Sequence, residues 1–317
     1  MDFRISIPFS KQDHNQIDYH SEIVFFGSCF AENMADKINY YKFRQTSNPF
    51  GILYHPLALE NLITRSINNT LFTKNDCLEV NDRWISLETH SRLSAQTADE
   101  LIERLNSALL KTQQGLLNAS HVVITLGTSW VYRHISSDRL VANCHKIPQK
   151  AFLKELLGVD KIRESLDALI NLIKQVNDGV VLIFTVSPVR HIRDGIIENA
   201  RSKANLISAI HELIEPRKKI HYFPAYEIMM DELRDYRFYA DDMIHPSRMA
   251  IHYIWEKFSS VWLKPETTGI MKEVDAIQKA LAHKPFQPES KSHLMFKEEL
   301  DSRITKLKQR YDFISFE

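Results

Sequence analysis

The sequence predicts an α/β domain in which helices cover both faces of a mainly parallel sheet. Short apolar runs rich in β-branched residues alternate along the chain with longer segments of helical periodicity. The apolar runs lack a clean alternation of polar and apolar residues, as is typical of strands buried on both faces of a parallel sheet. A strand-helix alternation of this kind indicates βαβ units and a doubly wound sheet. With 317 residues, the chain is long enough to bury a large core.

Four strands and six helices can be placed from these patterns. The strands are expected at 23–26, 121–126, 180–186 and 220–223, and the helices at 32–41, 57–67, 98–112, 152–176, 196–214 and 248–263. An alternating segment at 77–93 predicts a small hairpin, and 130–148 reads as a polar, irregular insertion after a strand. We therefore expect an α/β domain over residues 1–263.

From residue 264 onward the pattern is helical and charged. One apolar stripe runs along it, formed by Leu300, Ile304, Leu307 and Tyr311. Residues 264–317 are therefore expected to form a helical C-terminal extension that packs on the domain or on a partner.

Composition excludes several classes of function. The 40 basic and 40 acidic residues cancel, which argues against nucleic acid or a membrane surface as a partner. Three cysteines without paired spacing fit a reducing compartment. The first residues lack the apolar stretch of a signal peptide, so a cytoplasmic location is expected. The eight glycines form neither a dinucleotide-binding nor a Walker A motif, so no cofactor is expected.

The first candidate site is the turn between the strand at 23–26 and the helix that follows. Gly27 ends the strand, and Ser28 and Cys29 are two side chains capable of nucleophilic attack. At this position both lie at the carboxyl edge of the sheet, where helix N–H groups stabilise a thiolate or an oxyanion. The alternative is that Ser28 caps the helix and Cys29 is a small buried apolar residue.

The second candidate lies just before the last long helix of the domain. Asp242 and His245 are separated by two residues and are followed by Pro246. This spacing can place His245 as a general base with Asp242 orienting its imidazole. An ordinary turn with a loop histidine remains the alternative.

Together the two segments resemble the GSCFA family, which is named for its amino-terminal motif and belongs to the wider SGNH/GDSL hydrolase-like superfamily. The resemblance covers roughly residues 1–263. It is carried by the strings at 27–31, 48–51, 126–130, 143–146, 185–191, 202–204 and 242–246. It implies a three-layer, flavodoxin-like sandwich of the SGNH-hydrolase type.

The resemblance also implies roles for individual residues. The superfamily's nucleophilic serine falls on Cys29, and its Asp-x-x-His block is matched by Asp242 and His245. Gly51, in the segment that begins at Asn48, matches the glycine that supplies an oxyanion N–H. Ser129 stands where the superfamily has an oxyanion-binding asparagine.

These matches predict an ester hydrolase or acyltransferase acting on an acylated small molecule or glycan. The ungapped alignment and the helix N-terminus favour Cys29 over Ser28 as nucleophile. Two other classes stay open. The departures from the superfamily pattern at Cys29 and Ser129 are compatible with a binding protein whose chemistry has been retuned or lost. Cys29 with Cys144 as its resolving partner is compatible with a redox-responsive thiol protein.

Further residues are candidates for the wall of the pocket. Trp130 fits an aromatic wall for a sugar or acyl group, and His145 lies in the insertion that can reach the pocket rim. Arg190 or His191 can bind an anionic group, and a solvated turn is the alternative. No metal is expected, because zinc ligands normally show paired local spacing.

Overall fold

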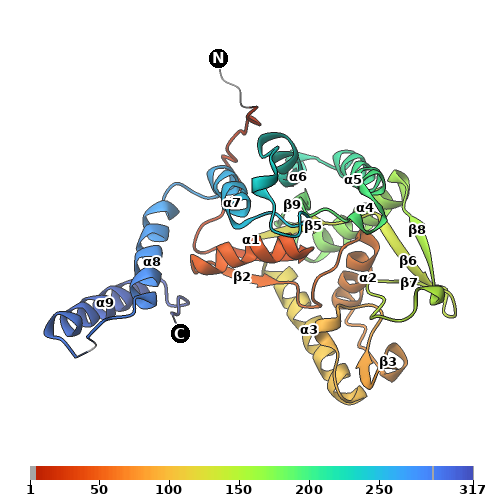
Figure 1. Ribbon diagram of the computed structural model, residues 1–317, viewed down its shortest axis with the longest axis horizontal. Coiled ribbons are helices and arrows are strands. Elements are labelled where there is room, and N and C mark those ends of the chain that lie inside the picture. The colour runs from red at the N-terminus through yellow and green to blue at the C-terminus, as the bar shows by residue number, and fades with distance from the viewer. Residues whose placement is uncertain (1–4, 288, 317) are drawn as a thin grey trace.

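The computed structural model describes residues 5–287 and 289–316. Its centre is a five-stranded, wholly parallel sheet in the order β2-β1-β5-β9-β10 (Figure 1). The strands are β1 (Glu22–Gly27), β2 (Arg44–Ser47), β5 (His121–Leu126), β9 (Val181–Val186) and β10 (Ile220–Tyr222). This is a flavodoxin-like order, in which strands are added on one side of β1 first and then on its other side, so that the order of strands reverses between β1 and β5. The predicted α/β class and parallel sheet are confirmed.

Side chains alternate between the two faces of each central strand. Val24 and Phe26 of β1 belong to one core cluster, whereas Ile23 and Phe25 belong to the other. Every residue of β5 and β9 is buried, which explains their continuous apolar sequence.

Helices complete a three-layer sandwich around this sheet. Residues of α2 (Pro56–Ile67), α3 (Ala98–Asn118), α4 (Val159–Val176) and α5 (Ile196–His211) pack in the first cluster. Residues of α1 (Cys29–Tyr40), the short α6 (Ala225–Glu227) and α7 (Arg248–Trp262) pack in the second. Short 3-10 and π turns lie at Lys74–Asp76, Ser91–Leu93, Gln149–Ala151, Ile192–Asp194, Pro216–Lys218, Ile228–Glu232 and Tyr236–Phe238.

The segment expected to be irregular is an ordered antiparallel sheet. β6 (Trp130–His134) pairs with β7 (Arg139–Val141) on one side and with β8 (Phe152–Leu156) on the other. The helix predicted at 152–176 was therefore wrong at its start, because β8 occupies its first turns and Gly158 caps α4. The predicted hairpin is present as β3 (Leu78–Val80) and β4 (Arg83–Ile85).

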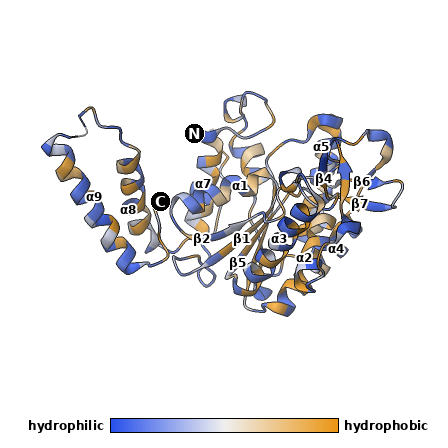
Figure 2. Cartoon of the chain, turned by 90° about the horizontal axis from the view of Figure 1, so that it is seen from below, coloured by the Kyte–Doolittle hydropathy of each residue, from blue (hydrophilic) through white to orange (hydrophobic). Residues whose placement is uncertain are grey.

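The C-terminal part is a pair of helices, α8 (Thr267–Ala282) and α9 (Lys291–Arg310). Figures 1 and 2 show the pair at the opposite end of the molecule from the sheet β7-β6-β8, and Figure 2 shows α9 to be mostly hydrophilic. Leu300 and Leu307 are nevertheless buried and share a core cluster with α1 and α7. Within residues 5–287 and 289–316, no helix is long and apolar enough to cross a membrane.

Candidate active site at the carboxyl edge of the sheet

The turn after β1 is shaped by its glycine. Gly27 has a φ of 126°, and a Cβ on it would lie 2.0 Å from the carbonyl oxygen of Thr125 on β5. Its N–H donates to Oδ1 of Asn48 at 2.8 Å. β1 therefore runs against β5 up to its last residue, and the chain then turns directly into α1.

Ser28 and Cys29 have different environments in this turn. Ser28 is the N-cap of α1, fully buried, and its Oγ accepts a hydrogen bond from the N–H of Phe30 at 3.3 Å. Cys29 is the first residue of the helix and lines a cavity of about 710 Å³. Ser28 does not line that cavity.

Cys29 does not have the thiolate character that its helix position predicts. Burial raises the pKa of the thiol above its ordinary value of 9.0, and Glu32 raises it further. The N–H groups of Cys29 and Phe30 and the ammonium group of Lys203 lower it by less. The thiol is therefore protonated near neutral pH and needs a base to become a nucleophile.

A histidine from the far end of the chain lines the same cavity. Nδ1 of His245 lies 2.7 Å from Oδ2 of Asp242, and the other carboxylate oxygen accepts the N–H groups of Ile244 and His245. These contacts lower the pKa of Asp242 to about 2. The ionised carboxylate therefore favours a proton on Nδ1, which leaves the lone pair of Nε2 available as a base. The structure thus brings Cys29 and the Asp242–His245 pair together.

Gly51 and Ser129, the other two predicted oxyanion donors, do not line the cavity. The N–H of Gly51 donates to the carbonyl of Asn48 at 2.8 Å. Ser129 is fully buried, and its hydroxyl donates to the carbonyl of Ser202 at 3.1 Å. Asn48 holds the turn through Gly27 and borders a different pocket. The N–H of Cys29 forms no hydrogen bond with a backbone carbonyl of the described chain; at the start of α1 it interacts with the thiol of Cys29 itself.

The three other predicted wall residues all line the cavity. Trp130 opens β6, and its indole N–H donates to the carbonyl of Glu198 at 3.3 Å. Nε2 of His145 donates to backbone carbonyls at 2.8 and 3.0 Å. The guanidinium group of Arg190 donates to the hydroxyl of Tyr239 at 3.0 Å.

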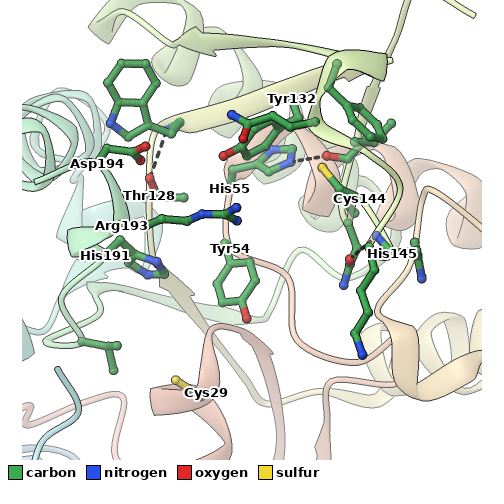
Figure 3. Close-up of a pocket in the computed structure, with 18 of the residues that line it drawn as sticks. Cys29, Tyr54, His55, Thr128, Tyr132, Cys144, His145, His191, Arg193 and Asp194 are labelled. Carbon is green, nitrogen blue, oxygen red and sulfur yellow. Dashed lines mark hydrogen bonds between the residues drawn. The ribbon is translucent and has the colours of Figure 1, made fainter. Parts of the chain in front are cut away.

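Three residues at the site were missed by the sequence interpretation as individual candidates. Tyr54 and Arg193 line the cavity, and Figure 3 shows the side chain of Arg193 reaching into it from the side opposite Cys144. Lys203 lies beneath the floor of the site, where its Nζ donates to the carbonyls of Gly127 and Ser187 at 2.7 Å each.

A signal for Lys203 is present in the sequence. The residue shares helical spacing with Leu206 and Ile210, which are buried on the same face of α5. Arg193 lies in the 3-10 turn Ile192–Asp194, which is too short for any periodicity to have pointed to it.

The positions of the cysteines bear on whether the site could form a disulfide or hold a metal ion. Cys29 and Cys144 both line the cavity, but both are free thiols, and Figure 3 shows them on different sides of it. Burial raises the pKa of both thiols. Among the described residues, no group of three His, Cys, Asp or Glu side chains is placed to hold a metal ion.

The fold and the site define a doubly wound α/β protein whose candidate active site combines a cysteine with an aspartate–histidine pair. The chain belongs to the GSCFA family, which matches residues 22–258. The C-terminal domain of GSCFA domain proteins matches residues 274–317. No curated protein matches the chain.

Two of the solved structures that match the chain are esterases. One is a carbohydrate esterase family 3 from Talaromyces cellulolyticus, at 7% identity and a TM-score of 0.36. The other is an acetyl esterase mutant with acetate ion, at 7% identity and a TM-score of 0.37. Each comparison covers 80% of this chain and 99% of the other chain.

Proposed function

We propose that this protein is an ester hydrolase or acyltransferase that uses Cys29 as its nucleophile and acts on an acylated small molecule or glycan. One observation carries the proposal. Cys29, at the start of α1, and His245, just before α7, line one cavity, and His245 is hydrogen-bonded to Asp242. A partly buried thiol in the same cavity as an oriented imidazole provides the two groups that a cysteine nucleophile and its base require.

The first half of the reaction forms a thioester. Nε2 of His245 takes the proton from the thiol of Cys29 as the sulfur attacks the ester carbonyl carbon. The C–O bond of the resulting tetrahedral intermediate breaks, and His245 gives its proton to the departing alcohol. In the second half, water or an acceptor hydroxyl loses a proton to His245 and attacks the thioester carbonyl. The C–S bond then breaks, and the proton on His245 returns to the sulfur.

Two groups of this chain can stabilise negative charge during these steps. The N–H of Cys29 at the start of α1, which interacts with the thiol in the resting protein, is the proposed donor for the oxyanion. The positive charge of Lys203 favours the thiolate form of Cys29. Tyr54 and Trp130 contribute aromatic wall to the cavity, which suits an acyl chain or a sugar ring.

The test is a screen with short-chain p-nitrophenyl esters and a panel of acylated sugars. Cys29→Ala and His245→Ala are expected to lower kcat/KM by about 10²-fold or more, because each removes the attacking atom or its base. Ser28→Ala is the matched comparison. It should keep most activity and cost about 1 kcal/mol of stability, as the loss of an N-cap does.

The covalent intermediate gives a second readout. Mass spectrometry of the protein quenched during turnover should locate the acyl group on Cys29. Activity that survives Cys29→Ala but disappears in Ser28→Ala would show that the nucleophile is Ser28. Absence of turnover and of any adduct would show that the protein is not an acyl-transfer enzyme.

A binding protein is the second candidate. The observation that favours it is that the Gly51 N–H and the Ser129 hydroxyl, two predicted oxyanion donors, are engaged in the protein's own hydrogen bonds. In that case, ligands would bind in the cavity of both wild type and Cys29→Ala with equal affinity and without conversion.

A further inference from the structure

The cavity that contains Cys29 and His245 has an excess of positive charge. Its lining holds three permanently charged cationic side chains and one carboxylate: Lys146, Arg190, Arg193 and Asp194. The whole chain, in contrast, has equal numbers of acidic and basic residues. The lining therefore carries a net positive charge although the chain as a whole is neutral.

The carboxylates near the cavity are already bound by the protein. Asp194 forms an ion pair with Lys154, which also lies over the ring of Trp130. Asp242 is hydrogen-bonded to His245. Glu32, whose charge acts on Cys29, forms an ion pair with Arg92 at 2.8 Å. None of the three is free to neutralise the cations of the wall.

Those cations have no anionic partner. Neither Arg193 nor Lys146 forms an ion pair or a side-chain hydrogen bond with any residue of the described chain. Arg190 is held by Tyr239 through its Nε and contacts no carboxylate in the same ranges. Figure 3 shows Arg193 reaching across the middle of the cavity, above Tyr54.

The wall also contains polar atoms that lack a partner. Nε2 of His191 and Nδ1 of His145 are buried, and no group of the described chain forms a hydrogen bond with them. Buried polar nitrogens are normally paired. Both residues line the cavity, although the two nitrogens themselves are buried.

We infer that the ligand of this cavity carries a negative charge, a carboxylate or a phosphate, which binds to Arg193 with support from Lys146 and Arg190. A guanidinium group binds both anions through paired N–H donors. This inference rests on the function proposed above, and it narrows the substrate to an acyl ester that bears an anionic group.

Binding is tested first, in the Cys29→Ala protein, so that no probe is consumed. The probe pairs are 4-acetoxybenzoate with its neutral methyl ester, and phenyl phosphate with phenyl methyl ether. Ligand-observed NMR titration gives the Kd of each. The anionic member of at least one pair should bind more tightly, and which pair shows this tells a carboxylate site from a phosphate site.

Arg193→Gln in the same background should raise the Kd of the preferred anion by about 10-fold to 100-fold, as expected for the loss of a charge-assisted hydrogen bond. Arg193→Lys should keep part of the affinity and shows that the loop tolerates substitution. The matched control is Arg217→Gln. Arg217 is an exposed arginine just before β10, at the amino ends of the strands and so away from the site. This substitution should leave the Kd unchanged.

The inference is wrong if the anionic and neutral probes bind equally, or if Arg193→Gln and Arg217→Gln have the same effect. Turnover by the wild type separates this failure from that of the proposed function. Hydrolysis of 4-acetoxybenzoate and its methyl ester at equal kcat/KM would leave the esterase proposal standing and remove the anion site. If the anion binds in a way that depends on Arg193 but no ester is hydrolysed, the anion site stands and the esterase proposal fails.

Discussion

The burial of Lys203 predicts how the free energy of unfolding changes with pH. The side chain is almost fully buried, its Nζ donates to two backbone carbonyls, and no carboxylate of the described chain forms an ion pair with it. Burial lowers the pKa of Lys203 from its ordinary 10.5 to about 7, and only the thiolate form of Cys29 opposes the change. In the unfolded chain the lysine is in water and keeps its ordinary value.

The sign of the pH dependence follows from proton binding. Below pH 7 the lysine is charged in both states, so its contribution to stability does not vary with pH. Between pH 7 and 10.5 the unfolded chain binds more protons than the folded protein, and stability rises with pH. At 1.36 kcal/mol per pH unit, the free energy of unfolding should gain roughly 2 kcal/mol between pH 7 and pH 9 from this group.

The measurement compares wild type with Lys203→Met by urea unfolding at pH 7, 8 and 9. Titrating groups distant from Lys203 contribute equally to both proteins, so the gap in unfolding free energy reports Lys203 together with its coupling to Cys29 and His191. Between pH 7 and pH 9, we expect the unfolding free energy of wild type to rise by roughly 2 kcal/mol relative to that of Lys203→Met, whichever protein is more stable at pH 7. Lys218→Met removes an exposed lysine at the other edge of the sheet and should leave the gap constant. A gap for Lys203→Met that does not change with pH would refute a buried, titrating lysine.

Two other predictions concern the turn after β1 and the histidine pair. Gly27→Ala should destabilise the protein by about 3 kcal/mol or more, because the new Cβ would lie 2.0 Å from a backbone oxygen of β5 at a φ of 126°; a change below 1 kcal/mol in urea unfolding would contradict this contact. Asp242→Asn should lower kcat/KM on an accepted ester by about 10-fold to 10⁴-fold through loss of the His245 orientation, with Tm nearly unchanged because the side chain is half exposed. Equal kcat/KM in the two proteins would show that Asp242 has no part in positioning His245.

The central sheet could be predicted where burial imposes a continuous apolar sequence. β5 was placed to the residue, and β1, β9 and β10 to within one residue at each end. β2 was not predicted, because Arg44–Ser47 is a polar edge strand that pairs with β1 alone. Its strand character comes from a neighbour rather than from its own pattern.

The sheet formed by the insertion after β5 was not predicted, for a related reason. β6 is half exposed and polar, and its partners β7 and β8 are also only partly buried. The pairing of β6 with β8 passes over the intervening β7, with His134 opposite Phe152 and Trp130 opposite Leu156, so local periodicity carries no trace of it. Phe152–Leu156 has spacing that a helix could also use, and only the ladder with β6 makes it a strand.

By itself, the sequence determined the fold class, the edge of the sheet that carries the site, and the types of residue gathered there. These follow from apolar periodicity and from short strings at the ends of strands and helices, which are local properties of the chain. The tertiary structure decided which of those residues face the cavity. It buried Ser28 as a cap, turned Ser129 toward Ser202, exposed Cys29 to the cavity and raised its pKa. Such outcomes depend on the direction of each side chain and on the balance of burial against nearby charge, and contacts between distant segments set both.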